Sequence, residues 1–423
     1  MRQTASKTAN ERRLDAAGVA LLALAVSVAG IMNDFVYDDV PLVVDNFRLH
    51  SLRNLAELVS APYWPPPFVE QLYRPLAVTL FAVEWAIGAG SPIVFRLVSY
   101  ALYVASALSF FRLASMLVSR RVAFGAALLF AVHPVHVEAV ALGVNQGELI
   151  VAICGMMMLA RYIGQRRAGR LAAGDWLVIA AWYAVAVLTK ENGFILPVLL
   201  IAAETTVLRE AGGERPAGLM LLPGYSLIGG VAVAAFALRQ AVLGGLVGAS
   251  PAHALIGLSF GERAFTMLQV VPQWLRLLVW PQRLQADFAP DAFVLPATIG
   301  SAEVLGAMLV LGVGIAIAAT HRRVPVLSFG LLCTFIALVP VSNLVPTGIM
   351  LAERTLFLPS VGLLVAAAAA GEALLRQTRW DARAAFRALS IVVCVLVLLG
   401  AVRSASRHSV WNSAHLVVLP PSD

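Results

Sequence analysis

Apolar stretches long enough to cross a lipid bilayer recur along the whole chain, and this feature restricts its fold more than any other. A membrane-spanning helix needs about 20 mostly apolar residues, and a helix satisfies its own backbone hydrogen bonds in lipid. Of the 423 residues, 60% are hydrophobic and only 13% are charged, which excludes the ordinary soluble classes. The sequence therefore predicts an all-α polytopic membrane protein.

We expect about eleven transmembrane helices, all within a membrane domain over residues 16–402. Their approximate ranges are 16–32, 93–118, 122–142, 147–163, 171–189, 192–208, 218–238, 300–320, 324–345, 356–374 and 385–402. Two further stretches, 76–90 and 264–280, are short or interrupted by polar residues, so they are expected to be interfacial or re-entrant helices. The first lies in a long external loop over 33–92, and the second in an external region over 243–299.

The distribution of basic residues predicts the orientation. Most of the 31 Lys and Arg residues fall on the same side as the N-terminal segment 1–15, in short clusters such as Arg120–Arg121 and Arg322–Arg323. By the positive-inside rule this side is cytoplasmic, and the C-terminal tail 403–423 is outside. The net charge of +7 is then explained by topology, and we expect no nucleic-acid partner.

Four groups of polar side chains fall at the predicted outer ends of these spans. Charged residues at a bilayer surface inside such apolar sequence favour a functional site. Carboxylates there can act as a general base toward a hydroxyl or bind a divalent cation, and basic side chains can hold a phosphate. The four groups are Asp34, Asp38 and Asp39; His133, His136, Glu138, Asn145, Gln146 and Glu148; Lys190 and Glu191; and Asn343, Glu353 and Arg354.

Each group also has a plainer interpretation. The aspartates fit an ordinary solvated loop, and Lys190 and Arg354 fit long side chains that reach the membrane surface. His133, His136 and Glu138 have a spacing found among metal ligands, but Pro134 interrupts the helix, and local hydrogen bonding explains the histidines as well. We assign no metal and leave a divalent cation open.

Five ordered segments resemble a known family. "DFVYDD", "YRPLAVTLF", "HPVHVEAVA", "LTKENG" and "NLVPTGIMLAERTLFLPSVG" are similar to recurring segments of the transmembrane and tetratricopeptide-repeat O-mannosyltransferases. These belong to the C superfamily of membrane glycosyltransferases, which have a cytoplasmic N-terminus and interfacial helices in the first loop. The similarity runs from about Asp15 to Trp411, which is nearly the whole chain.

The resemblance implies a glycosyltransferase C-type fold and a polyprenyl-phosphate sugar donor, usually mannose, used with inversion at the anomeric carbon. It implies that Asp38 is the catalytic base, with Asp39 in support and Asp34 and Glu138 as further catalytic candidates. On the basis of their charge, Arg354, Lys190 and Arg74 are expected to contact the donor phosphate. The remaining residues expected to line the site, largely on its acceptor side, are His133, His136, Glu191 and Glu353.

The resemblance has one departure. Family members continue into a repeat domain outside the membrane, and the sequence ends where that domain is expected to begin. The acceptor is therefore left open as a protein, a glycan or a lipid, with recruitment by another subunit as an alternative. Arginine far outnumbers lysine, which occurs only at Lys7 and Lys190, and this composition favours a bacterial inner membrane.

Two other functions remain as alternatives from the sequence. One is transport of a lipid-linked glycan, which requires polar residues at mid-membrane depth or paired broken helices. The polar groups gather at one surface instead, which favours transfer chemistry. The other is a non-catalytic subunit of a glycosylation complex.

Overall fold

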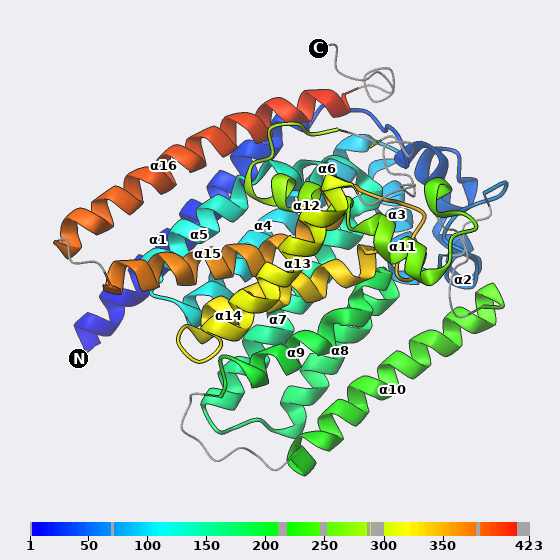
Figure 1. Ribbon diagram of the computed structural model, residues 1–423. Helices are drawn as coiled ribbons and strands as arrows, with labels where there is room; N and C mark the ends of the chain where they lie inside the picture. The colour runs from blue at the N-terminus through cyan, green and yellow to red at the C-terminus, as the bar shows by residue number, and fades with distance from the viewer. Residues whose placement is uncertain are drawn as a thin grey trace.

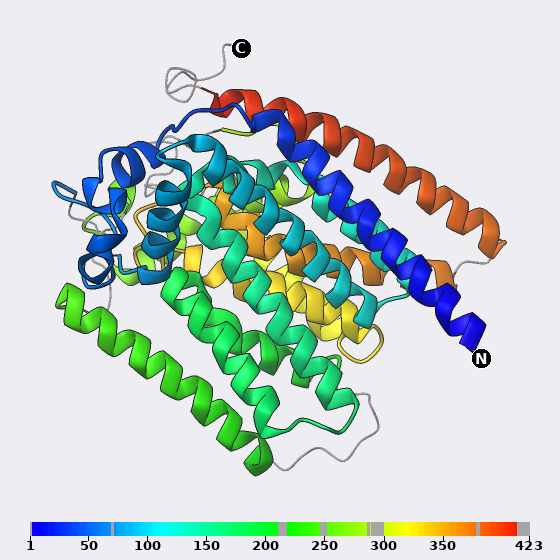
Figure 2. The same ribbon diagram turned by 180° about the vertical axis from the view of Figure 1, so that it is seen from behind.

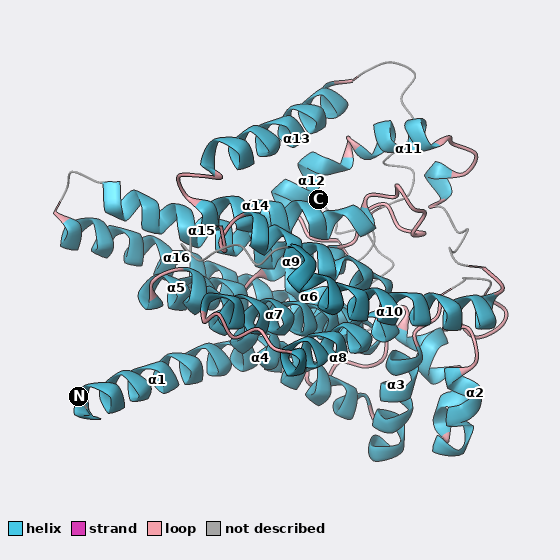
Figure 3. Cartoon of the chain, turned by 90° about the horizontal axis from the view of Figure 1, so that it is seen from below, coloured by secondary structure: helices cyan, strands magenta, loops and turns pink. Residues whose placement is uncertain are grey.

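Only helices and loops occur in the described part of the chain, so the predicted all-α membrane protein is confirmed. The computed structural model describes residues 2–68, 72–209, 218–245, 252–285, 288, 300–377 and 381–412. Figure 1 shows the long helices lying roughly side by side, with α2 (Leu55–Val59), α3 (Pro75–Gly88) and α11 (Phe260–Met267) gathered at the end far from the N-terminus. Figure 3 shows the same bundle from below, with every regular element helical.

Seven helices among the described residues are long and apolar enough to span a membrane. An eighth candidate is a broken pair, in which α5 (Arg120–Ala131) is followed by a bent segment that includes α6 (Val137–Ala141) at an angle of 49°. Pro134 explains the break because it cannot continue the hydrogen bonding of α5. The seven are α1 (Arg2–Ser27), α4 (Pro92–Leu117), α7 (Gln146–Arg167), α10 (Gly218–Leu243), α13 (Ser301–Thr320), α15 (Phe357–Gln377) and α16 (Ala382–Arg407).

The expected count of eleven spans is not confirmed, because the other three ranges form shorter helices. The helix α8 (Ala173–Thr189) has 17 residues, α14 (Pro325–Leu338) has 14 and α9 (Leu196–Thr205) has 10. A 3₁₀ turn adjoins α9 at its start and α14 at its end, so part of each apolar run is not α-helical. At 1.5 Å per residue, none reaches the roughly 30 Å of a bilayer core as a straight helix.

The two stretches expected outside the spans are also helical. Residues 76–90 fall largely in the single helix α3, whereas 264–280 are divided between α11 and α12 (Val270–Val279). Much of the expected external region 243–299 lies outside the described residues, as does the end of the expected tail 403–423.

Close packing is concentrated in the middle of the bundle. The main core gathers side chains from α1, α4, α5, α7, α8, α14 and α15. By contrast, only 17% of the membrane window of α10, 11% of that of α13 and none of that of α16 is buried within the protein. Figure 2 shows α16 lying beside α1 at the edge of the bundle. These three helices therefore present most of their surface to lipid.

Two glycines allow the closest helix contact in the core. Gly330 of α14 and Gly362 of α15 face each other: a Cβ built on Gly362 lies 2.5 Å from the backbone nitrogen of Thr334 and 2.6 Å from the carbonyl oxygen of Gly330. Small residues let two helix backbones approach within a membrane. Because α15 begins one residue after Leu356, this contact also fixes the segment that carries Arg354.

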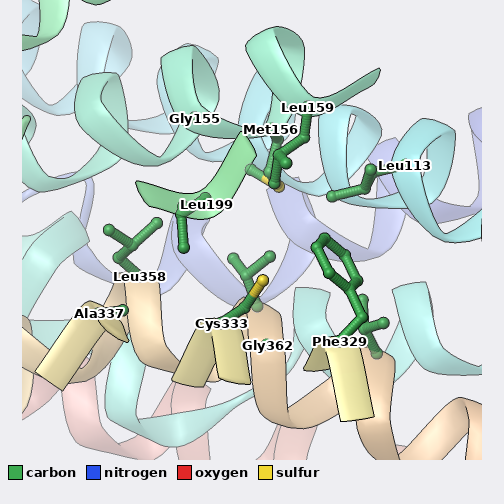
Figure 4. Close-up of a pocket in the computed structure, with 12 residues that line it drawn as sticks. Leu113, Gly155, Met156, Leu159, Leu199, Phe329, Cys333, Ala337, Leu358 and Gly362 are labelled. Carbon is green, nitrogen blue, oxygen red and sulfur yellow. The ribbon is translucent and has the colours of Figure 1, made fainter. Parts of the chain in front are cut away.

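An apolar pocket lies beside the same contact. Figure 4 shows its lining from several helices, including Met156, Cys333 and Leu358. Its volume of about 10 Å³ is about the least that can hold one water molecule. None of the predicted site residues lines it, so the pocket belongs to the packed core.

We expect Gly362→Ala to destabilise the protein, because the added methyl group meets backbone atoms that have no room to move. Overpacking of this kind costs about 1–3 kcal/mol. The measurement is the thermal unfolding midpoint of the purified protein in detergent. Gly314→Ala in α13 is the matched control, since a Cβ there meets nothing within 4 Å; equal midpoints for the two variants would contradict the tight contact.

Candidate active site

Asp39 is an anchor buried beneath the surface of the site. Its side chain is fully buried and accepts hydrogen bonds from the backbone nitrogens of Gly143 at 3.1 Å and Val144 at 2.9 Å. Arg96 of α4 lies 3.5 Å from the same carboxylate. Burial raises the pKa of Asp39, while Arg96 and the two amides act in the opposite direction. Asp39 therefore ties the first loop to α4 and to the start of α7.

Asp38 lies next to this anchor but faces a different environment. Its side chain is 24% exposed, and an oxygen lies 3.6 Å from Nη2 of Arg354. Tyr37, immediately before it, has a φ of 54°, a left-handed conformation that side-chain-bearing residues rarely adopt. The turn thus separates the two acids: one is fixed inside, and the other stays accessible beside a cation.

Arg354 is the central cation of the site. It lies in the 3₁₀ turn η11 (Glu353–Leu356) that precedes α15. Its guanidinium forms a salt bridge with Glu138 of α6, and its backbone nitrogen donates to the same carboxylate at 2.8 Å. Glu138 is fully buried, whereas the Arg354 side chain is 9% exposed. Glu138 therefore holds the Arg354 guanidinium in place, and the Nη2 atom of that guanidinium still faces Asp38.

Lys190 follows the end of α8 and has a similar arrangement. Its Nζ lies 2.8 Å from Oε1 of Glu148 in α7, and Asn192 donates to the other oxygen at 3.2 Å. The Lys190 side chain is 12% exposed. Burial lowers the pKa of Lys190, and Glu148 partly opposes this shift. The ammonium is thus held by one carboxylate and keeps a small accessible surface.

Arg74 and Glu191 form the third pair. Nε and Nη2 of Arg74 donate to one oxygen of Glu191 at 2.9 and 2.8 Å. The guanidinium also lies over the ring of Tyr63, 4.7 Å from its centre, and Arg239 of α10 reaches the other Glu191 oxygen at 3.4 Å. Burial opposes ionisation of Glu191, yet Arg74 keeps its pKa below the ordinary value. This pair joins the first loop to the end of α8 and to α10.

These pairs belong to one group, which we call the charged cluster: Asp38, Arg74, Glu138, Glu148, Lys190, Glu191, Arg239 and Arg354. Lys190 interacts electrostatically with both Arg74 and Arg354, and Arg354 interacts with Asp38. The structure therefore brings together the predicted acid, the three predicted phosphate-binding cations, Glu138 and Glu191. Such a group can accept a proton at Asp38 and stabilise negative charge at the three cations.

Asp34 and Glu353 lie outside the charged cluster. The Asp34 side chain is exposed and accepts only from the neighbouring Phe35 nitrogen, at 2.8 Å, among the bonds that the structure describes. Glu353 is fully buried; it pairs with Arg407 of α16 at 3.2 Å and accepts from the backbone nitrogen of Gln285 at 2.6 Å. Glu353 therefore fastens the end of α16 to the turn that carries Arg354.

The two histidines hold the fold at the break after α5. Nε2 of His133 lies 2.9 Å from the carbonyl oxygen of Leu278, and His136 lies 3.2 Å from the Tyr103 hydroxyl and 2.8 Å from that of Ser360. The buried ring of His136 lies against the buried rings of Phe130 and Phe357. Within the described ranges, no three His, Cys, Asp or Glu side chains form a group suited to a metal ion.

Sequence reasoning missed three residues that shape the site. Arg96 and Arg239 lie within apolar helices, and a buried arginine in such a helix is itself a signal of function or of a paired carboxylate. Tyr63 gives no such signal, because its place under Arg74 depends on how the first loop folds back. Its neighbours in "APYWPPPF" suggest only a stiff segment.

The chain is similar in sequence to proteins named as O-mannosyl-transferases. No family model matches the chain. It is 26% identical to protein O-mannosyl-transferase TMTC4 of Mus musculus over 93% of its own length, and 28% identical to protein O-mannosyl-transferase Tmtc1 of Drosophila melanogaster over 65%. A shorter match to protein O-mannosyl-transferase TMTC3 of Homo sapiens is 32% identical over 38% of the chain.

The chain resembles the TMTC-type O-mannosyltransferases. It spans 59% of the length of the mouse TMTC4 protein, 34% of the fly protein and 18% of the human protein. The resemblance expected from the five ordered segments is therefore confirmed. Because the match to TMTC4 covers 93% of this chain, it includes the whole charged cluster.

We expect Glu138→Ala to destabilise the protein strongly, because it leaves the buried guanidinium of Arg354 without its closest carboxylate. Breaking a buried ion pair on one side costs about 3–5 kcal/mol. The thermal unfolding midpoint measures this. Arg376→Ala serves as the control, since Arg376 pairs with Glu372 at a largely exposed position, where such pairs contribute about 1 kcal/mol or less. A Glu138→Ala midpoint equal to the control would contradict the anchoring role.

Proposed function

We propose that this chain is a membrane glycosyltransferase that moves a sugar from a polyprenyl-phosphate donor to a hydroxyl group of a protein. Mannose is the proposed sugar, because the relatives are named protein O-mannosyl-transferases. The observation that carries the proposal is the partly exposed Asp38 at 3.6 Å from Arg354, within a cluster that also holds Lys190 and Arg74. A base and several cations in one place suit transfer from a phosphate to a hydroxyl.

Asp38 is the proposed general base. The acceptor oxygen attacks the anomeric carbon, its proton passes to the Asp38 carboxylate, and the bond between that carbon and the phosphate oxygen breaks. One displacement of this kind inverts the anomeric carbon. Asp39 cannot take this part, because its carboxylate is fully buried and already bonded to two amides and Arg96. It fixes the position of Asp38 instead.

The three cations are the proposed stabilisers of the leaving phosphate. Negative charge grows on that phosphate as the sugar leaves, and positioned cations lower the energy of this state. Arg354, Lys190 and Arg74 each have a carboxylate that fixes the side chain without covering it completely. Because they come from three separate segments, the phosphate would bind where α8, α15 and the first loop meet.

The proposed location is the outer face of a bacterial inner membrane, with the N-terminus in the cytoplasm. Arg120 begins α5, and Arg166 and Arg167 lie in the last turn of α7, opposite the first turn that carries Glu148 of the charged cluster. Positive charge of this kind marks the cytoplasmic side. The bacterial assignment rests on the excess of arginine over lysine, and the relatives named above are animal proteins.

We expect Asp38→Asn to reduce the rate of transfer by about 10²–10⁴-fold while the unfolding midpoint stays near that of the wild type, since the amide keeps the shape but cannot accept the proton. The assay follows radiolabelled mannose from polyprenyl-phosphate mannose to a serine- or threonine-containing peptide. Asp34→Asn is the matched control and should transfer at the wild-type rate. Equal rates for Asp38→Asn and Asp34→Asn would exclude Asp38 as the base.

We expect Lys190→Met to weaken donor use, because it removes one of the three cations but keeps a side chain of similar length. The ratio kcat/KM for the donor should fall by roughly tenfold or more, as expected when a charged hydrogen bond of about 1.5–3 kcal/mol is lost. Titration of the donor in the same assay gives this ratio. An unchanged ratio would remove Lys190 from the phosphate site, and Arg209→Met, at an exposed position, is the control.

A further inference from the structure

A buried carboxylate lies behind the acidic pair and has no part in the mechanism above. Glu84 projects from α3 into the protein interior, where the residue is only 1% exposed. Neither of its oxygens has a hydrogen-bond partner in ordinary geometry among the described residues. A buried carboxyl group without a partner carries a high desolvation cost, so its surroundings require an explanation.

Other polar atoms without partners lie around the same place. Among the described residues these are Nε and Nη1 of Arg96, the Tyr100 hydroxyl and Oε1 of Gln146. Glu84 interacts electrostatically with Arg96 and Asp39, and Tyr100 interacts with Arg96, so the groups share one interior region. The amide nitrogen of Gln146 lies near Glu84 but donates to Phe95 and Ser99.

The unpaired atoms have complementary chemistry. Arg96 offers hydrogen-bond donors, Glu84 and Gln146 offer acceptors, and the Tyr100 hydroxyl can do both. A buried water molecule typically makes about three hydrogen bonds to polar groups that would otherwise be unpaired. Two waters between Arg96 and Glu84, at about three hydrogen bonds each, would match the number of these unpaired atoms. A cation is a poorer occupant, because the guanidinium of Arg96 already supplies positive charge there.

We propose that Glu84, Arg96, Tyr100 and Gln146 enclose a buried water site, and that Glu84 acts through it as a positioning residue for the acidic pair. Arg96 is the connection. Its Nη2 donates to the backbone oxygen of Asp34 at 2.7 Å, and its Nη1 lies 3.5 Å from the Asp39 carboxylate. The guanidinium thus holds both ends of the turn that presents Asp38, and the water-bonded Glu84 holds the guanidinium.

The protonation of Glu84 fits this arrangement. Burial raises its pKa to about 8, while Gln146 and Arg96 favour the charged form and Asp39 opposes it. At neutral pH the carboxyl group therefore keeps its proton and can both donate and accept hydrogen bonds. In the unfolded chain the pKa of this group has its ordinary value of 4.5, so the folded state binds the proton more tightly. The contribution of Glu84 to stability is therefore complete below about pH 4.5 and is lost as the pH rises toward 8.

The first test compares Glu84→Gln with Glu84→Leu in the full-length chain. Glu84→Gln retains a donor and an acceptor and should keep most of the transfer rate, whereas Glu84→Leu displaces the water and should lower kcat by roughly tenfold or more with little change in KM for the donor. Val83→Gln, at an exposed position of the same helix, is the control. The proposal is wrong if Glu84→Leu transfers at the wild-type rate or if Glu84→Gln is equally impaired.

The second test does not depend on sugar transfer, so it separates this inference from the proposed function on which its catalytic part rests. The unfolding midpoint of the wild type should fall between pH 6 and pH 9 more than that of Glu84→Gln. In addition, the effects of Glu84→Leu and Asp39→Asn on the midpoint should be non-additive, because both act through Arg96. Identical pH profiles together with additive effects would overturn the connection. Wild-type protein without transferase activity would overturn only the proposed function.

Discussion

Burying a charge away from water is costly unless an opposite charge and hydrogen bonds accompany it, and this constraint organises the end of the bundle that holds the site. Each largely buried cation there has a carboxylate from a distant part of the sequence: Arg354 has Glu138, Lys190 has Glu148, and Arg74 has Glu191. The same pairs that neutralise charge also connect the helices. The proposed site for an anionic substrate thus consists of the same contacts that hold this end of the fold together.

The adjacent acids Asp38 and Asp39 show how neighbouring residues of the same type acquire different chemistry. Their sequence positions are nearly equivalent, but the left-handed turn at Tyr37 directs Asp39 to the amides before α7 and leaves Asp38 beside Arg354. The fully buried Asp39 fixes the turn, and the partly exposed Asp38 is the proposed general base. A general base must be able to accept a proton and must be held in a fixed position, and the two neighbouring acids would together meet both requirements.

The sequence predicted the class of fold and much of the cluster because both depend on local signals. Apolar runs indicate helices in a membrane, and charged residues at the ends of such runs are conspicuous, so Asp38, Lys190 and Arg354 were identifiable. The count of spans was not, because 3₁₀ turns shorten α9 and α14 in ways that hydropathy does not record. His133, His136 and Glu353 also show a limit of sequence reasoning: only the tertiary partners reveal that they fasten the backbone.

The attachment of α16 has a mechanical consequence. None of the residues in the membrane window of α16 is buried. Near the end of the helix, however, Arg407 forms a salt bridge with Glu353, and Ser404 donates a hydrogen bond to the carbonyl oxygen of Val132 at 2.8 Å. Although most of its surface faces outward, α16 also packs against α1, α5 and α15, and these two bonds fix its C-terminal end. Since Glu353 and Arg354 are consecutive, a displacement of this end of α16 would move the backbone beside the Arg354 guanidinium.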